Sequence, residues 1–250
     1  DILRFHTVYW PAFLMAAKLP LPLKIYGHGW ILSDDKKMSK STGNILDPIE
    51  IIEKYGIDQL RYYLIKEVSL GNDGNISLQN LKNCINNDLA NNFGNLCQRV
   101  FSFIEKNCSG KLPKYSQLEK VDLELMSNLT DMVEELKENM NNQDLNNYVK
   151  KVVEFSFNAN KYFNDLEPWA LKKTNIERMN TILYTIVTQI KNISILLSPI
   201  IPISSDKILD IMNLKSEDRL LKSINNINIF NHSLEFKKTS ILFKKIENDN

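Results

Sequence analysis

The strongest constraint on the fold is a spacing of apolar residues by three and four positions, sustained through the second half of the chain. Four long segments carry it, from Leu78 to Phe103, Leu118 to Met140, Leu145 to Phe163 and Ile176 to Leu197, and a fifth, shorter segment runs from Ser205 to Met212. Such spacing places the apolar side chains on one face of an α-helix. A single helix of this kind leaves that face in water and is not stable alone. Residues 77–214 are therefore predicted to form an all-α bundle.

The first part of the chain has a different pattern. Residues 1–76 mix short apolar runs with turn residues, which predicts an α/β unit ending near the turn at 71–77. Its expected elements are a helix over 5–18, a strand over 24–32, a polar loop over 33–44, and two helices that follow Asp47 and Gly56. Asp47 and Pro48 are typical of a helix N-cap and first turn. Residues 215–250 have a strand-like composition, and we expect this tail to pack back on the body.

Composition excludes several classes of protein. The chain has 250 residues, 43% of them hydrophobic and 24% charged, with a formal net charge of +1, as in ordinary globular proteins. Its longest apolar run, residues 193–203, is interrupted by prolines and is too short to span a membrane. No signal peptide opens the chain, so a cytoplasmic location is expected. The first residue, Asp1, is not Met and suggests an internal cut.

The three cysteines are not placed to bind a metal. Cys84, Cys97 and Cys108 have no metal-ligand spacing and cannot all pair. They are predicted to be reduced thiols packed as small hydrophobic groups, and no zinc ligands or other metal site are expected within this chain.

The polar loop carries the residues with the clearest chemistry. Lys37 to Asn44 holds two lysines, three hydroxyls and a glycine. Ammonium groups neutralise phosphate charge, and hydroxyls and backbone N–H groups donate to its oxygens. The loop lies between a strand and a helix, as anion sites at the edge of a parallel sheet do. On composition alone, a solvated surface loop remains an alternative.

The string Lys37-Met38-Ser39-Lys40-Ser41 resembles the KMSKS signature of class I aminoacyl-tRNA synthetases. The later segment 54–63 resembles one shared by the leucine, isoleucine, valine, methionine and cysteine enzymes. The resemblance implies a Rossmann-type catalytic domain, of which residues 1–76 are the last part. It also implies ATP and Mg²⁺ as cofactors, and all five signature residues as ATP contacts. Lys40, with Lys37 second, is the expected catalytic residue, and His28 and Gly29 are weaker candidates for nucleotide contact.

The opening of the chain indicates the amino acid. Asp1-Ile2-Leu3-Arg4-Phe5-His6 with Tyr9-Trp10-Pro11-Ala12 is similar to the DIxxFHxxxWPA stretch of methionyl-tRNA synthetases. The resemblance implies that Ile2, Phe5 and His6 border the methionine pocket. Polarizable apolar and aromatic walls suit a thioether. Without the family, His6 is interpreted as an ordinary half-buried histidine.

Two segments of the bundle resemble the parts of that family that read the anticodon. Asp88, Asn92, Asn95 and Arg99 are expected to form a polar row on the first bundle helix, and residues 92–99 resemble the family's base-reading helix. The segment 167–172 resembles its Pro-Trp element. The resemblance implies that Asn95, Arg99, Pro168 and Trp169 bind the anticodon. The alternatives are a solvated helix face and a packed tryptophan.

Together these patterns predict the last part of a methionine–tRNA ligase. The expected partners are tRNA, methionine, ATP and an N-terminal catalytic half, because the family's HIGH motif does not occur in this sequence. The chain alone is expected to be inactive. Two alternatives remain, namely another class I synthetase and a non-catalytic tRNA-binding module.

Overall fold

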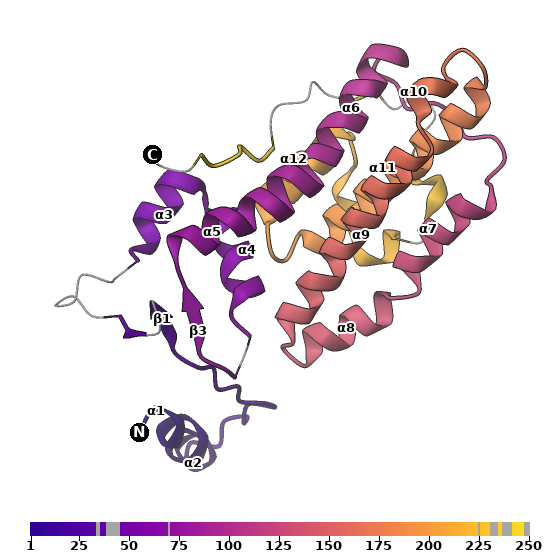
Figure 1. The fold of residues 1–250 in the computed structure, drawn as a ribbon. Coiled ribbons are helices and arrows are strands. Elements are labelled where there is room, and N and C mark those ends of the chain that lie inside the picture. The colour runs from indigo at the N-terminus through magenta and orange to yellow at the C-terminus, as the bar shows by residue number, and fades with distance from the viewer. Residues whose placement is uncertain are drawn as a thin grey trace.

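The computed structural model describes residues 1–33, 36–38, 46–69, 71–224, 226–230, 235–236 and 242–247. It shows a small α/β part followed by a larger helical part, so the predicted fold class is confirmed (Figure 1). The domain boundaries at 76 and 214 remain predictions.

The N-terminal helix stands apart from the body of the molecule (Figure 1). It consists of α1 (Ile2–Arg4), a π-helical stretch η1 (Phe5–Tyr9) and α2 (Trp10–Ala16), so the helix predicted over 5–18 starts earlier and ends earlier. None of its residues is buried, and its large apolar side chains lie in solvent. A group of exposed apolar side chains of this size is typical of an interaction surface.

A three-stranded sheet follows, in the order β2-β1-β3. β1 (Ile31–Ser33) pairs antiparallel with β2 (Lys36–Lys37) and parallel with β3 (Gly74–Ile76), with Leu32 opposite Asn75. The strand predicted over 24–32 is wrong for residues 24–30, which belong to no helix or sheet. The partner strand β3 is only three residues long, so the ladder cannot continue along that segment.

Two helices connect the sheet to the bundle. The Asp47 carboxylate accepts a hydrogen bond from Ile49 N at 2.8 Å and caps α3 (Pro48–Tyr55) as predicted. Gly56, at φ 105°, turns the chain into α4 (Ile57–Glu67), in a backbone conformation that favours glycine.

Several hydrogen bonds attach helix α4 to the bundle. The Arg61 guanidinium donates to the carbonyls of Ile200 at 2.8 Å and Pro199 at 2.9 Å. The Asp58 carboxylate accepts from Ser204 N at 2.6 Å. Tyr62 and Lys66 both donate to the buried Asp88 carboxylate, Tyr62 at 2.8 Å. These bonds hold the α/β part against the helices that follow.

The bundle is built on three long helices (Figure 1). The first is continuous through α5 (Leu78–Cys84), the π-helical η3 (Ile85–Gly94) and α6 (Asn95–Asn107), and the Ser77 hydroxyl caps it by accepting from Asn80 N at 3.1 Å. The others are α9 (Leu145–Asp165) and α11 (Ile176–Leu197), with short α10 (Pro168–Leu171) between them and α12 (Pro202–Ile211) after them.

One predicted helix is two. The segment 118–140 forms α7 (Lys120–Thr130) and α8 (Val133–Asn141), which meet in a turn at residues 131–132. Figure 1 shows the two helices running in different directions, α7 beside α11 and α8 across the end of the bundle. The apolar spacing continues through the turn because both helices pack on α9.

The C-terminal tail was predicted to be strand-like, and this is wrong for most of its described part. It contains the 3₁₀ turns η4 (Ser216–Asp218), η5 (Leu221–Ser223) and η6 (Ile227–Ile229), and a single antiparallel bridge between Lys111 and Glu235. Its backbone instead bonds to helix side chains: the Asn86 carboxamide accepts from Ile246 N and donates to Ile246 O, both at 2.8 Å. The described apolar side chains of the tail thus pack one at a time against the helices and do not form a strand face.

A buried ion pair joins α7, α9 and α11. The Asp122 side chain is 0% exposed, and it accepts from the Arg178 guanidinium at 2.5 and 2.9 Å and from the Tyr162 hydroxyl. Burial alone would raise the pKa of the Asp122 carboxyl, but the hydrogen bonds from Arg178 and Tyr162 outweigh it and lower the pKa.

We predict that Arg178→Met destabilises the bundle by about 3–5 kcal/mol at pH 7, because it leaves a buried carboxylate without its cation. A lowered folded-state pKa contributes stability above the unfolded-state pKa and loses it as the pH falls through the folded-state value. The gap between variant and wild type should therefore shrink as the pH falls from the unfolded-state pKa, about 4, through the lower folded-state pKa, where Asp122 becomes protonated in the wild type. Urea unfolding at pH 7 and pH 3.5 measures both.

The control is Lys120→Met, which removes an exposed i,i+4 pair with Glu124 and should change stability by less than about 1 kcal/mol at either pH. An equal loss in the two variants would contradict the buried pair's role.

Candidate nucleic-acid interface and nucleotide pocket

The polar row predicted on the first bundle helix divides into an inner and an outer half. Asp88 is buried against Tyr62 and Lys66, and the buried Asn92 donates to the Ser156 hydroxyl at 2.6 Å. Asn95 is exposed and Arg99 half-buried. The predicted row is therefore exposed to solvent only in its second half, although Asn92, Asn95 and Arg99 line one hollow. Residues 85–94 are π-helical, with a wider turn than the α-helix on which the sequence spacing was read.

Beside Asn95 lies a hollow of about 500 Å³ that we call the asparagine hollow. η3, α6 and α9 line it with Asn87, Asn91, Asn92, Asn95, Arg99, Phe157, Asn160 and Asn164. The Asn160 carboxamide donates to the Asn92 side-chain oxygen at 2.8 Å, and this bond holds two lining side chains in place. Each carboxamide offers both a donor and an acceptor, so this surface can pair with the edge of a flat heterocycle.

A second hollow adjoins the first at Arg99, and we call it the aromatic hollow. Its volume is about 250 Å³, and its lining residues are Arg99, Ser102, Phe103, Lys106, Asn107, Phe163 and Trp169. The Arg99 guanidinium lies over the Phe163 ring at 5.3 Å and over the Trp169 ring at 5.9 Å. It also donates to the Asn164 side-chain oxygen at 2.7 Å. Two aromatic rings and one amide thus hold Arg99 in place.

The local chain geometry presents the Trp169 ring to solvent. Glu167, with φ 41°, has a left-handed backbone, and Pro168 starts the short helix α10. Pro168 itself is buried, whereas Trp169 is 42% exposed. The Trp169 ring meets Phe163 edge to face, with centroids 5.7 Å apart. Trp169 contacts Phe163 and Arg99 and still remains 42% exposed, so the solvent-facing part of the indole can stack on a base.

The structure therefore brings Asn95 and Arg99 of α6 together with Trp169 of α10. It adds Asn160, Phe163 and Asn164 of α9, which sequence analysis missed. Asn160 and Asn164 are four residues apart and share a helix face, a signal that is visible in the sequence but typical of any solvated helix.

The residues predicted for methionine and nucleotide gather at the other end of the molecule. A hollow of about 470 Å³ is lined by Ile2, Leu3, His6 and residues 25–30, so Ile2 and His6 share it with His28 and Gly29. Phe5 lines an adjoining hollow of about 440 Å³. A side chain at position 29 would start 2.2 Å from the Asn72 carbonyl oxygen, so this close approach requires glycine.

The signature loop is only partly described. Lys37 ends β2, and the half-buried Met38 packs against the core. Ser39, Lys40 and Ser41 lie outside the described residues. Among the described residues, no three His, Cys, Asp or Glu side chains gather as metal ligands would. None of the helices that the structure describes is long and apolar enough to cross a membrane.

The cysteines are free and packed in the helices. Cys84 and Cys97 are buried and Cys108 is half-buried. Burial raises the pKa of the Cys84 thiol to about 12 and raises that of Cys97 as well. These thiols stay protonated at neutral pH and are unreactive.

Comparisons with known proteins match both parts of the chain. Residues 1–101 match the family described as tRNA synthetases class I (M), and residues 112–250 match the anticodon binding domain of methionyl tRNA ligase. A methionine–tRNA ligase of Brucella suis is 43% identical over 219 residues, covering 88% of this chain and 42% of the relative. One from Rickettsia felis is 40% identical over 252 residues, covering 100% of this chain and 49% of the relative.

A solved structure agrees with these matches. Mycobacterium tuberculosis methionyl-tRNA synthetase in complex with methionyl-adenylate superposes with a TM-score of 0.91 at 34% identity, over 97% of this chain and 48% of that chain. The sheet remnant, the signature sequence and the helical bundle are parts of a class I aminoacyl-tRNA synthetase. Within that class, the chain belongs to the methionyl-tRNA ligase family. It spans less than half the length of these relatives, 42% and 49%.

The stacked arrangement at Arg99 can be tested with Trp169 as the only tryptophan, in a Trp10→Phe, Trp30→Phe background. A cation over an exposed ring is worth about 0.5–1 kcal/mol, so Arg99→Ala should shift the packed population of the Trp169 ring roughly two- to fivefold. Acrylamide quenching of its fluorescence should rise accordingly. Lys106→Ala, which removes another cation lining the hollow, should leave quenching unchanged; the opposite ranking would contradict the geometry.

Proposed function

We propose that this chain is the part of a methionine–tRNA ligase that carries the KMSKS loop and the anticodon-binding surface. The observation that carries the proposal is the joining of the asparagine and aromatic hollows at Arg99, on a bundle that matches the family's anticodon-binding domain. The whole protein then joins methionine to its tRNA at the expense of ATP.

The first step of this reaction forms methionyl-adenylate. The methionine carboxylate attacks the α-phosphorus of ATP, and the bond to the departing pyrophosphate breaks. Negative charge grows on the phosphate oxygens, and Lys40, with Lys37 second, stabilises it more in the transition state than in the ground state. Magnesium bound to the ATP phosphates would neutralise further charge.

The second step passes methionine to the terminal ribose of the tRNA. A ribose hydroxyl attacks the methionyl carbonyl, and AMP leaves with the bonding electrons. Ile2, Phe5 and His6 hold the thioether side chain during both steps, with His28 and Gly29 beside the nucleotide. The shared hollow of Ile2, His6, His28 and Gly29 supports this assignment. The exposed apolar faces of α1 and α2 supply the surface against which an N-terminal catalytic half would close.

The tRNA is recognised at the opposite end of the molecule. Asn95 and Arg99 bind the edges of unstacked anticodon bases, Trp169 stacks on one base, and the buried Pro168 sets the ring's position. Single-stranded loops are read in this way, by edge contacts and aromatic stacking. The bundle lies between this surface and the nucleotide hollow, so the two activities should be separable by mutation.

We predict that Lys40→Ala in the full-length enzyme lowers the rate of adenylation by roughly 100- to 1,000-fold, the usual cost of one preorganised charge donor. The affinity for methionine should change little, because the substitution affects the attack of the carboxylate on ATP and leaves the contacts to the thioether side chain unchanged. ATP–pyrophosphate exchange measures the rate, and equilibrium dialysis measures the affinity.

The control for Lys40 is Lys36→Ala, which removes a nearby lysine outside the signature. A loss confined to methionine binding, or an equal loss in the control, would contradict a role for Lys40 in the transition state.

We predict that Trp169→Ala lowers the efficiency of tRNA charging by roughly 10- to 100-fold, since one stacking platform is worth about 1–3 kcal/mol. ATP–pyrophosphate exchange should stay at the wild-type rate, and Trp169→Phe should restore part of the charging. Both reactions are measured on one preparation whose melting curve matches wild type.

The matched control for Trp169 is Ile176→Ala, an exposed apolar residue close by in the sequence that lines neither hollow. A parallel fall in exchange and charging would exclude Trp169 as a base reader, and no fall in either would make it a packing residue.

A further inference from the structure

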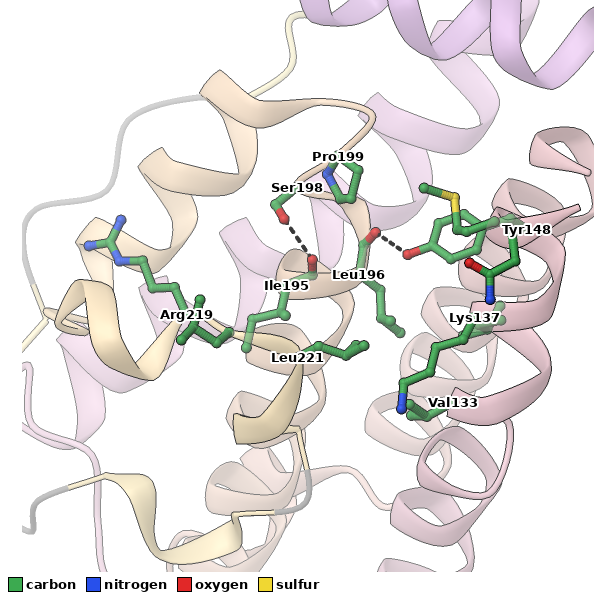
Figure 2. Close-up of a pocket in the computed structure, with 13 residues that line it drawn as sticks. Val133, Lys137, Tyr148, Ile195, Leu196, Ser198, Pro199, Arg219 and Leu221 are labelled. Carbon is green, nitrogen blue, oxygen red and sulfur yellow. Dashed lines mark hydrogen bonds between the residues drawn. The ribbon is translucent and has the colours of Figure 1, made fainter. Parts of the chain in front are cut away.

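A separate hollow lies between α8, the end of α11 and the turn at residues 219–221 (Figure 2). Its volume is about 460 Å³, within the range of small-molecule sites. It shares no lining residue with the asparagine, aromatic or nucleotide hollows. The reaction described above therefore makes no use of it.

The walls of this hollow are mainly apolar. Its lining includes the buried side chains of Leu136, Ile195 and Leu196. Val133 and Leu221 lie on different elements at its wall (Figure 2). The side chain of Leu221 remains 39% exposed, so the hollow opens to solvent. Exposed leucine beside a preformed apolar cavity is surface that a ligand can remove from water.

The polar groups of the lining are already used within the protein. The Tyr148 hydroxyl donates to the Leu196 carbonyl at 2.6 Å, and the Ser198 hydroxyl donates to the Ile195 carbonyl at 2.8 Å (Figure 2). An occupant would gain little by hydrogen bonding to either hydroxyl. The lining therefore selects for shape and apolar surface.

The two cations at the edge are paired with acids. The Lys137 ammonium lies 2.6 Å from the Glu134 carboxylate. The Arg219 guanidinium bonds to Asp206 at 3.2 Å and to Asp210 at 2.5 Å, and it points away from Tyr148 in Figure 2. With both cations neutralised, an anionic ligand has no free partner here, and a neutral one suits the site.

The hollow shares two of its lining residues with the contacts that hold the α/β part to the bundle. The Pro199 carbonyl accepts from Arg61 of α4 at 2.9 Å, and the Asn141 carbonyl accepts from the Tyr26 hydroxyl at 3.1 Å. Both carbonyls belong to residues that line the hollow. An occupant would therefore rest against the backbone that receives these bonds, and ordering that backbone makes their opening less frequent.

We propose that this hollow is a binding site for a neutral, mainly apolar small molecule, and that its occupation stabilises the attachment of α4 to the bundle. The proposal is independent of the anticodon and nucleotide assignments, because it rests on different residues and requires neither tRNA nor ATP.

The test uses indole as a neutral apolar probe of the intact protein. Ligand-observed saturation-transfer NMR should show saturable binding to wild type. Val133→Trp fills the hollow from the half-buried wall of α8 and should weaken binding at least tenfold. Leu123→Ala, which truncates an exposed leucine of α7 outside the hollow, should bind indole as wild type does. Circular dichroism and melting curves establish that each variant is folded.

Amide hydrogen exchange of residues 57–67, with and without indole, measures the effect on the attachment of α4 to the bundle. Exchange should slow on addition of indole to wild type and to Leu123→Ala, and stay unchanged in Val133→Trp. Absence of saturable binding, or binding that survives Val133→Trp, would overturn the site. Binding without slower exchange in α4 would show that occupation of the hollow does not stabilise the attachment of α4 to the bundle. Neither result would affect the anticodon proposal, which is tested by tRNA charging.

Discussion

The burial of α11 on all sides is the constraint on which the bundle depends. From Ile182 to Leu197 each of its residues is buried, and α6, α7, α9, α10 and α12 pack around it. Most polar groups buried on such a helix are hydrogen-bonded within the protein. The Thr188 and Ser194 hydroxyls donate to carbonyls one turn earlier, and the Lys191 ammonium donates to the carbonyl of Ser223 at 2.7 Å. The tail is thereby drawn onto the helix that organises the core.

This packing also builds the candidate RNA surface. Arg99 stands on α6, Asn164 on α9 and Trp169 on α10, and the three meet only because these helices pack together near α11. The guanidinium is held by the Asn164 amide and by two aromatic rings, and such preorganisation reduces the entropy that a side chain would lose on binding a ligand. A mutation that loosens the bundle should therefore weaken recognition without touching a contact residue.

Sequence patterns were reliable where the physics is local. The three-and-four spacing, the Asp47 cap and the glycine turn at Gly56 depend on a few neighbouring residues, and the structure has all of them. The break between α7 and α8 escaped prediction because both helices bury one continuous apolar stripe on α9. The conformation of the tail escaped prediction because a β-strand and a loop with apolar side chains can have the same composition. Which of the two forms depends on the surface against which the segment packs.

The sequence by itself determined the helical content, the family and the identity of the signature loop, since each rests on residues adjacent in the chain or on one face of a helix. Only the tertiary structure decided which half of the polar row faces the solvent. Asp88 points into the protein because Tyr62 and Lys66 donate hydrogen bonds to it there, and Asn92 because the Ser156 hydroxyl accepts one from it. The π-helical stretch also changes the angle between successive side chains. Burial of a polar group is favourable only beside a partner, and such partners come from distant parts of the chain.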